Sequence, residues 1–412
     1  MELTEEVIKQ TKDIETPFLF VDLDILKEKY KTLKEALGDI EIYYAMKANS
    51  DINVLKTLVG LGSKFETASV NEILLLIKLG VKPEDIVNSV PFRKEKDTKT
   101  MYDAGIRLFC YDTFAEAERV KKVAPDAKMF LRIHVENQGS DWPMPKKFGA
   151  EASDALEIIK KTREIGLEVI GITFHTGSQC RSVSNWTNSL MLVKNIFREC
   201  AQEGITLKMI NLAGGIPIQH RKKIPTIKAI SKAIHVYVEK NFSPIHKMMI
   251  EQGRGMVGDC GIMIAQVVSK REFKGETWLY LDIGVFTGMM ETICDFDYEL
   301  LTEKDLKNKG LSNSSNENGQ NGNSAKPEKE EYVIAGPTCD GVDVMFKKKK
   351  ITKVEVGDRV YIINAGAYTL SYAALFNGYK LPMVYYYVAT GKDKKDYPDK
   401  PSCLVENYYN VS

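Results

Sequence analysis

The sequence predicts an α/β protein in which a (β/α)8 barrel is followed by a β domain. Eight short apolar runs between Tyr43 and Ile250 alternate with segments of helical spacing. Together they cover roughly 230 residues, and a barrel of this kind typically has ~250. After Gly261 the pattern changes to strand-like runs with no regular helices between them, which indicates a second domain built mainly from strands.

Each barrel run is short and apolar, as expected for strands buried on both faces. The runs lie near Tyr43, Phe65, Ile86, Leu108, Leu131, Ile172, Ile210 and Ile250. The clearest helical segments between them, with apolar residues at i, i+3 and i+4, are 70–79, 113–123, 152–165, 185–203 and 227–238. A doubly wound open sheet is the alternative, but no glycine fingerprint follows the first strand to support it.

Outside the barrel, residues 17–22 are expected to form a strand that precedes it. Later strands are expected at 262–268, 278–283, 332–334, 359–363 and 384–388. Residues 311–330 are rich in Asn, Ser, Gly and Lys and have almost no apolar side chain. Such a segment cannot bury enough surface to offset the entropy of ordering it, so this composition predicts a disordered surface insertion. The lysine run at 347–350 predicts a solvated turn, and a nucleic-acid patch is a poor alternative.

Composition narrows the class of protein. The chain has 412 residues, of which 44% are hydrophobic and 27% charged, as in a globular protein of two ordinary domains. A formal net charge of +1 gives no electrostatic reason to expect nucleic acid or an anionic membrane as a partner. No apolar run reaches ~18 residues, and the acidic N-terminus lacks the layout of a signal peptide. Seven scattered cysteines without metal-site spacing favour free thiols in a reducing, cytoplasmic setting and no metal site.

Lys47 ends the first barrel run, where a side chain would point into an enclosed site. There the lysine would lose hydration and could act as a neutral amine nucleophile. A solvated lysine is the usual alternative. However, residues 43–49, Tyr-Tyr-Ala-Met-Lys-Ala-Asn, closely resemble the lysine segment of the alanine-racemase-like (fold type III) pyridoxal-phosphate decarboxylases. That family includes the ornithine, lysine, arginine and diaminopimelate decarboxylases, and the resemblance implies that Lys47 carries the cofactor covalently.

Three further strings at predicted strand ends resemble motifs of the same family. In the first, residues 175–178, the resemblance places the His175 imidazole against the cofactor ring and Ser178 at its phosphate. In the second, Gly214 and Gly215 would offer backbone amides to the phosphate, although Ala213 replaces the first of the family's three glycines.

In the third string, residues 251–254, Gln252 stands where the family has proline. The resemblance pairs Glu251 with the pyridine nitrogen, which keeps the ring protonated and strengthens it as an electron sink. It places Gly253 and Arg254 at the phosphate.

Two single residues extend the match within the barrel. Arg132 lies within the apolar string 130–133, and a buried arginine needs an anionic partner. The family arginine at this place faces the cofactor. Glu66, in the string 65–69, holds the position of a family acidic residue near the reactive side of the cofactor.

Strings beyond the barrel indicate the subfamily. Residues 336–340, Gly-Pro-Thr-Cys-Asp, resemble a segment of ornithine and lysine decarboxylases. By that resemblance Cys339 manages protonation after decarboxylation and Asp340 binds the distal amine of the substrate. Residues 281–295 resemble the bacterial lysine/ornithine subgroup, in which Asp295 would be a second carboxylate for that amine. Tyr368, in the string 366–369, would meet the phosphate.

The resemblance also implies an organisation: residues 1–30 join the β domain, 31–262 form the cofactor-binding TIM-like barrel, and 263–412 form the β domain with its insertion at about 311–330. A homodimer with shared active sites is expected, with pyridoxal 5'-phosphate as cofactor. The implied function is decarboxylation of ornithine or lysine to putrescine or cadaverine. A decarboxylase of diaminopimelate, arginine or a siderophore precursor, a racemase and a non-catalytic regulatory homologue are alternatives. One methylene separates ornithine from lysine and is worth only ~1–3 kcal/mol in an apolar pocket, so the sequence does not separate them.

Overall fold

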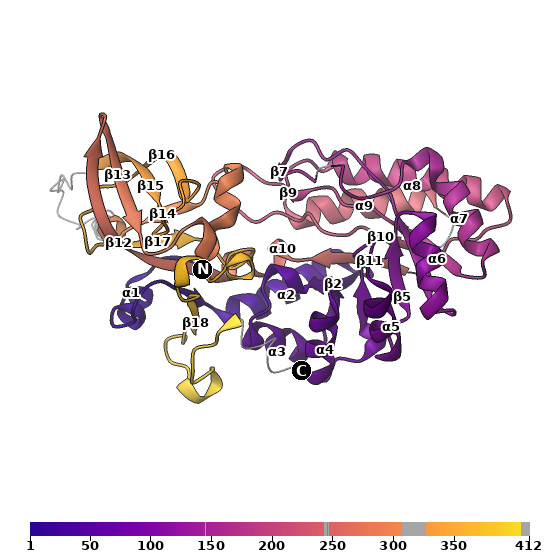
Figure 1. Ribbon diagram of the computed structural model, residues 1–412, viewed down its shortest axis with the longest axis horizontal. Coiled ribbons are helices and arrows are strands. Elements are labelled where there is room, and N and C mark those ends of the chain that lie inside the picture. The colour runs from indigo at the N-terminus through magenta and orange to yellow at the C-terminus, as the bar shows by residue number, and fades with distance from the viewer. Residues whose placement is uncertain (145, 243–244, 246, 307–326, 405–412) are drawn as a thin grey trace, which may run out of the picture. The chain divides into compact units, whose positions relative to one another are not determined.

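The computed structural model describes residues 1–144, 146–242, 245, 247–306 and 327–404. Among these residues the chain divides into two compact units. The barrel unit is Lys27–Met256, and the β unit is Met1–Leu26 together with Val257–Leu404. Figure 1 labels elements of both units.

The barrel unit contains a closed barrel of eight strands, in which neighbouring strands are parallel. Around the barrel the order is β10-β11-β2-β3-β4-β5-β6-β8. The strands are β2 (Glu41–Ala45), β3 (Lys64–Thr67), β4 (Ile86–Asn88), β5 (Leu108–Tyr111), β6 (Lys128–Arg132), β8 (Glu168–Thr173), β10 (Met209–Asn211) and β11 (Lys247–Gln252). All eight apolar runs of the sequence are therefore barrel strands, and the predicted barrel is confirmed.

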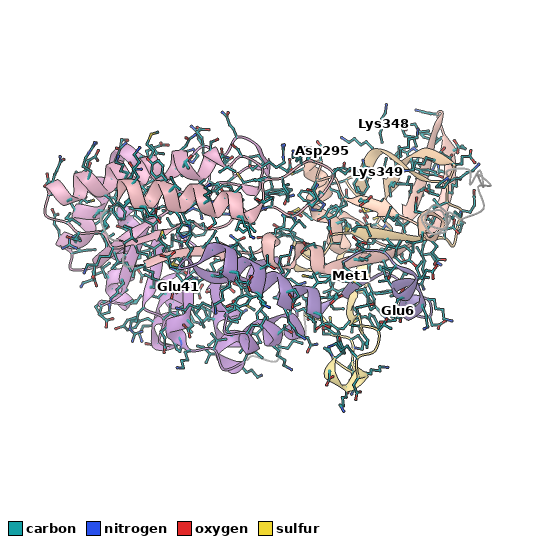
Figure 2. The ribbon with its side chains drawn as sticks, turned by 180° about the vertical axis from the view of Figure 1, so that it is seen from behind. Met1, Glu6, Glu41, Asp295, Lys348 and Lys349 are labelled. Atoms are coloured by element: carbon teal, nitrogen blue, oxygen red, sulfur yellow. The ribbon has the colours of Figure 1, made fainter. Side chains whose placement is uncertain are left out.

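Packed side chains and ion pairs fill the barrel below its carboxyl ends. One buried cluster takes a side chain from each of six strands: Tyr43, Val87, Cys110, Phe130, Met209 and Met249. At the amino end of β2, Glu41 (labelled in Figure 2) pairs with Lys64 at 2.5 Å and with Lys247 at 3.3 Å. The interior is thus a solid core, and the carboxyl ends of the strands are left to carry function.

Helices follow the strands, and several begin at a capping side chain. Asp51, Ser69, Thr113 and Thr226 each accept a hydrogen bond from a backbone amide of the first helical turn. The helices are α2 (Leu23–Leu37), α3 (Ile52–Gly60), α4 (Val70–Lys78), α5 (Glu95–Asp103), α6 (Phe114–Val123), α7 (Ala155–Glu164), α8 (Ser184–Gln202), α9 (Ile227–Asn241) and α10 (Arg254–Val257). The short strands β7 (Ser140–Trp142) and β9 (Ser178–Cys180) pair with each other.

The β unit is a sheet of eight strands preceded by the helix α1 (Glu5–Thr11). The strand order is β14-β17-β12-β13-β15-β16, and β1 lies between β12 and β18. The strands are β1 (Phe18–Val21), β12 (Gly261–Phe273), β13 (Glu276–Leu281), β14 (Glu299–Leu301), β15 (Lys329–Ala335), β16 (Val344–Thr352), β17 (Arg359–Ile363) and β18 (Met383–Tyr386). A buried cluster that includes Phe18, Phe20, Ile262 and Tyr361 packs β1 against β12 and β17.

The lysine run 347–350 belongs to β16, so the prediction of a solvated turn is wrong. Three of the four lysines are exposed, but Lys349 is buried. Its Nζ contacts the carboxylate of Asp297, donates to the carbonyl oxygen of Tyr298 at 2.5 Å and lies 4.7 Å from the ring centre of Phe346. These partners compensate the burial of a charge that the sequence pattern had assigned to solvent. Figure 2 labels Lys349 and its neighbour Lys348.

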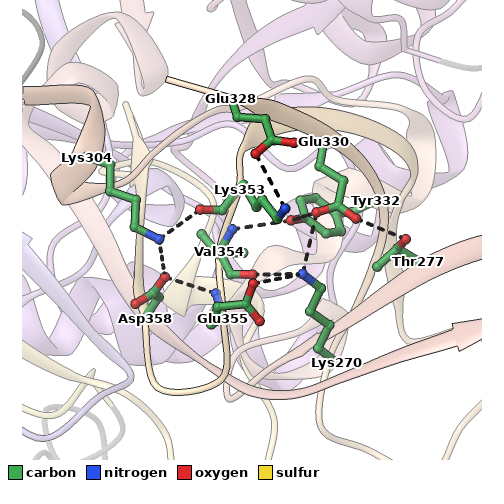
Figure 3. Close-up of polar contacts among 10 residues, drawn as sticks. All are labelled: Lys270, Thr277, Lys304, Glu328, Glu330, Tyr332, Lys353, Val354, Glu355 and Asp358. Atoms are coloured by element: carbon green, nitrogen blue, oxygen red, sulfur yellow. Dashed lines mark hydrogen bonds and ion pairs between the residues drawn. The ribbon is translucent and has the colours of Figure 1, made fainter. Parts of the chain in front are cut away.

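The expected insertion 311–330 falls largely on residues 311–326, which lie outside the described residues. The prediction of disorder does not hold for Lys329 and Glu330, because both belong to β15. Glu330 accepts hydrogen bonds from the Tyr332 hydroxyl at 2.6 Å and from Thr277 Oγ1 at 3.3 Å (Figure 3). Its side chain therefore ties β15 to β13.

One turn holds the two chain segments that flank residues 307–326. On one side, Lys304 Nζ donates to the carbonyl oxygen of Lys353 at 2.9 Å and pairs with Asp358 at 2.8 Å (Figure 3). On the other side, the backbone nitrogen of Lys353 donates to the carbonyl oxygen of Glu328 at 2.9 Å. Lys353 is therefore hydrogen-bonded both to the segment that precedes residue 307 and to the segment that follows residue 326.

All seven cysteines lie within the described residues, and each is a free thiol, as expected. Within the same part of the chain, no helix combines the length and the hydropathy needed to cross a bilayer.

Candidate active site

Lys47 lies in the helical turn that follows β2, at the carboxyl end of the barrel. Its Nζ is 2.7 Å from Glu66 Oε2, at the end of the neighbouring strand β3. The Lys47 side chain is 47% exposed, whereas that of Glu66 is 1% exposed. The expectation that burial strips Lys47 of hydration is therefore not met, and the buried partner Glu66 holds the ammonium instead.

The imidazole of His175 is fixed and neutral. It follows β8, and its Nδ1 accepts a hydrogen bond from the backbone nitrogen of Gly177 at 2.9 Å, which leaves the proton on Nε2. Burial, with the positive charges of Arg132 and Lys47, lowers the pKa of His175 to about 3. At neutral pH this residue offers an uncharged ring face.

The Gly214-Gly215 pair lies directly beside that imidazole. A Cβ at Gly214 would be 3.0 Å from His175 Nε2, and one at Gly215 would be 2.5 Å from Thr176 Oγ1. Gly215 also has φ of 119°, so both positions exclude a side chain. Ala213, which replaces the family's first glycine, keeps a left-handed φ of 44° at the expense of local strain.

Arg254 begins α10 immediately after Gly253, a buried residue that directly follows β11. Its Nε donates to Ser178 Oγ at 3.3 Å, which brings together two residues from different predicted strings. Arg132 ends β6, and its guanidinium lies 4.9 Å from the ring centre of Phe148. Arg132 forms no ion pair with a carboxylate among the described residues, so its charge is available to an anionic ligand.

Glu251 is buried near the end of β11, and two donors reach one of its oxygens. The Ser89 hydroxyl and Asn211 Nδ2, the latter at 2.6 Å, both donate to Oε1. Burial raises the pKa of Glu251 and the charge of Glu66 adds to this, while Lys47 and the two hydrogen bonds act in the opposite direction. Sequence reasoning gave no role to Ser89 or Asn211, and only the position of Asn211 at a strand end could have pointed to it.

The β unit holds the other four predicted site residues. Cys339 and Asp340 are exposed in the connection between β15 and β16. Asp295 is exposed at the end of a short helical turn, with φ of 59°, and Figure 2 labels it. Tyr368 follows β17 and also has a left-handed φ, of 55°. The structure therefore gathers Lys47 and nine further predicted residues at the carboxyl ends of the barrel strands, and places these four in the other unit.

Asp343 was not predicted, yet it organises the loops of the β unit. Its buried carboxylate accepts hydrogen bonds from the backbone nitrogen of Val285 at 2.7 Å and from Thr338 Oγ1 at 2.7 Å. A Cβ at Gly284 or at Gly336 would come within 2.3 Å of Asp343 Oδ1. These glycines let two loops close around one carboxylate.

The chain matches a family model, named relatives and solved structures. Residues 23–258 match the family model described as pyridoxal-dependent decarboxylase, pyridoxal binding domain. A lysine/ornithine decarboxylase of Selenomonas ruminantium is 29% identical over 92% of this chain and 92% of its own length. The crystal structure of SrLDC in complex with PLP and cadaverine matches with a TM-score of 0.82 and 29% identity over 94% of both chains. That of a Vibrio vulnificus lysine/ornithine decarboxylase complexed with putrescine matches with a TM-score of 0.80 and 25% identity over 94% of this chain and 99% of the other.

Proposed function

Because this chain belongs to the pyridoxal-dependent decarboxylases, we propose that it removes the α-carboxylate of ornithine or lysine to give putrescine or cadaverine. The observation that carries the proposal is the group of residues at the barrel ends: the ion pair of Lys47 with Glu66, the neutral His175 and the buried Glu251. The relatives named as lysine/ornithine decarboxylases support the choice of substrate.

The barrel residues fit pyridoxal phosphate. The phosphate would lie against Ser178, Arg254 and the backbone of Gly214, Gly215 and Gly253, where side chains at the first two glycines are excluded. Arg132 adds a positive charge without a carboxylate partner among the described residues, and Tyr368 of the β unit would complete this group. When bound, the cofactor supplies an electron sink for the pair left at Cα as CO2 departs.

The chain's own residues bind, orient and move protons. Lys47 provides the amine that holds the cofactor, and Glu66 fixes that amine from 2.7 Å away. Neutral His175 would face the ring without repelling a protonated ring, and the buried carboxylate of Glu251 would keep the ring nitrogen protonated. Cys339 is an exposed thiol and would deliver a proton to Cα.

Asp295 and Asp340 define the substrate class. Both carboxylates are exposed in the β unit, and both would pair with the distal ammonium of a basic amino acid. A substrate with a distal carboxylate would be repelled by the same pair. This charge argument favours ornithine or lysine over diaminopimelate.

We further propose a homodimer in which these residues of one chain complete the barrel site of its partner. Nine large apolar residues in the described part of the β unit are at least 38% exposed, and they include Ile293, Val342, Tyr372, Leu375, Phe376 and Tyr379. Several flank the predicted substrate residues, and Asn377 Oδ1 accepts a hydrogen bond from the backbone nitrogen of Cys339 at 3.1 Å. Exposed apolar residues at this density are typical of an interface. The free thiols favour the cytoplasm as the compartment.

A product assay tests the proposed reaction. The purified protein should absorb visible light through its cofactor and should release a diamine from ornithine or lysine, but no product from diaminopimelate. Borohydride should fix the cofactor on Lys47. A protein without visible absorption would instead be a non-catalytic homologue, and label on another lysine would refute the assignment of Lys47.

Asp295→Asn tests the substrate contact, because it keeps the volume and removes the charge. We expect KM for ornithine and lysine to rise about ten-fold or more, as for a charged hydrogen bond lost, with cofactor binding unchanged. Asp13→Asn, at a carboxylate that is 87% exposed in the same unit, is the matched control and should leave KM as it is. Equal kinetics for Asp295→Asn and the wild type would remove Asp295 from the site.

A further inference from the structure

The carboxylate of Glu251 is held from one side only. Both the Ser89 hydroxyl and Asn211 Nδ2 donate to Oε1. Oε2 accepts no hydrogen bond from any residue that the structure describes. Glu251 is only 6% exposed, and a buried carboxylate is costly unless its oxygens are hydrogen-bonded, so this arrangement indicates that a donor on a ligand reaches Oε2.

The orientation of Asn211 is fixed by its other end. Its Oδ1 accepts a hydrogen bond from the backbone nitrogen of Ala213 at 2.9 Å, so Nδ2 is the end that meets Glu251. The backbone nitrogen of Glu251 in turn donates to the carbonyl oxygen of Ala213 at 2.7 Å. β10 and β11 are thus locked in the register that places this amide against Oε1.

Ser89 is held by a buried arginine. Arg93 Nη1 donates to Asn88 Oδ1 and to the carbonyl oxygen of Val90, both at 2.7 Å, and these two residues bracket Ser89 in the chain. Arg93 Nη2 is 3.1 Å from Glu116 Oε1, in a pair whose side chains are 2% and 1% exposed. The segment that carries the Ser89 hydroxyl therefore has little freedom.

We propose that Ser89 and Asn211 are positioning residues that engage Oε1 of Glu251 so that Oε2 alone faces the ring nitrogen of the cofactor. The proposal rests on the proposed function, since it requires that Glu251 meets that ring. Two donors on one oxygen set the rotation of the carboxylate and leave a single acceptor for the protonated ring. Neither residue needs to touch the cofactor.

The test compares Ser89→Ala and Asn211→Ala with the wild-type protein. PLP is added to the dialysed full-length chain, and visible absorbance gives the dissociation constant and the pH at which the spectrum changes. Loss of a hydrogen bond to a charged group predicts a weakening of roughly ten- to a hundred-fold in each variant. We also expect the spectral transition to shift in pH, which a loss of general stability would not cause.

Two further variants separate positioning from folding. Ser89→Thr keeps the hydroxyl and should bind PLP within a few-fold of the wild type. Ser189→Ala removes a buried hydroxyl that donates to a backbone carbonyl in α8 at 2.7 Å, and it should leave the dissociation constant and the spectrum unchanged.

The possible outcomes are distinct. If the wild-type chain takes up no PLP, the proposed function is wrong and the positioning role falls with it. If the wild type and Ser189→Ala bind PLP, and Ser89→Ala and Asn211→Ala do so with unchanged constants and spectra, the positioning role is wrong and the proposed function stands.

Discussion

Asp343 Oδ1 accepts a hydrogen bond from the backbone nitrogen of Val285 at 2.7 Å, although 58 positions separate the two residues. Oδ2 of the same carboxylate accepts from the nitrogen of Thr338 at 3.0 Å and from its hydroxyl at 2.7 Å. The segment that leads to Asp295 and the loop that carries Cys339 are therefore anchored to one buried group. A substitution of Asp343 should therefore disturb the positions of both Asp295 and Cys339.

Asp343→Ala should lower the free energy of unfolding of the β unit by about 3 kcal/mol, because three hydrogen bonds to a buried carboxylate are lost together. Thr338→Val removes only the hydroxyl donor, one of the three hydrogen bonds, and should cost about a third as much. Thermal denaturation measures both variants, and KM for ornithine should rise in Asp343→Ala. A melting temperature equal to that of the wild type would show that the carboxylate is not the anchor.

Gln252 is buried in β11, and neither end of its amide has a hydrogen-bond partner in the described part of the chain. Gln252→Met should therefore stabilise the protein by about 1–3 kcal/mol, since it replaces unsatisfied polar atoms by apolar ones of similar volume. The matched control is Gln179→Met. Gln179 is also buried, but its Nε2 donates to the carbonyl oxygen of Ile218 at 2.5 Å and its Oε1 accepts from the nitrogen of Ile218 at 3.0 Å.

Melting temperatures of the two variants should move in opposite directions, upward for Gln252→Met and downward for Gln179→Met. A decrease in both would mean that Gln252 has a polar partner in solution, such as a buried water.

The lowered pKa of His175 predicts acid sensitivity. Below pH 6.5 the unfolded chain protonates this imidazole, whereas the folded chain does not until about pH 3. The free energy of unfolding should therefore fall by up to about 1.4 kcal/mol per pH unit between pH 6 and 4 on account of this residue. His175→Asn keeps an acceptor for the Gly177 amide and does not titrate, so the slope should be shallower.

Urea unfolding at pH 6, 5 and 4 measures that slope, and His235→Asn is the control. Although partial burial lowers the pKa of His235, hydrogen bonds to Asp39 and to the Ser231 carbonyl raise it overall. Its stabilising effect is complete below pH 6.5 and is lost as the pH rises through the folded pKa. The control variant should keep the acid slope of the wild type, and an unchanged slope in His175→Asn would contradict the prediction.

Subunit mixing tests the proposed shared site. Lys47→Ala and Cys339→Ala should each be nearly inactive. If subunits exchange at random, half of the dimers are mixed, and each mixed dimer has one intact site. Activity should then recover to roughly a quarter of the wild-type value in a symmetric dimer with two equivalent sites. Tagged subunits confirm exchange, and exchange without recovery would place both residues in a site built by one chain.

The local pattern of apolar residues was sufficient to predict the eight barrel strands. Strand runs such as those at Tyr43 and Ile250 are buried on both faces and read as continuous apolar segments. Helix α5 was not predicted, because only Thr98 and Met101 of its nine residues are buried and its apolar spacing is weak. Strand β16 was missed because its lysines hide the strand pattern and the partners of Lys349 lie about 50 residues away.

The predicted site residues were found from motifs at strand ends. The residues that position them, such as Ser89, belong to no such motif and were not predicted. Nothing in the segment around Ser89 signals a contact with Glu251, which lies 162 residues further along the chain. The barrel closure brings them together, so only the three-dimensional structure reveals the pair. Likewise, we expected burial to remove the hydration of Lys47, but the structure shows a half-exposed side chain in an ion pair with Glu66.

Because Lys353 holds both chain segments that flank residues 307–326, we expect this position to accept a grafted domain. Because Lys304 and Glu328 are both bonded to that one residue, the ends of any segment between them are fixed by the sheet itself. Each doubling of the intervening length then costs only about 0.6 kcal/mol in closure entropy. A fluorescent reporter whose own termini lie close together could be spliced into this position while the barrel chemistry continues undisturbed.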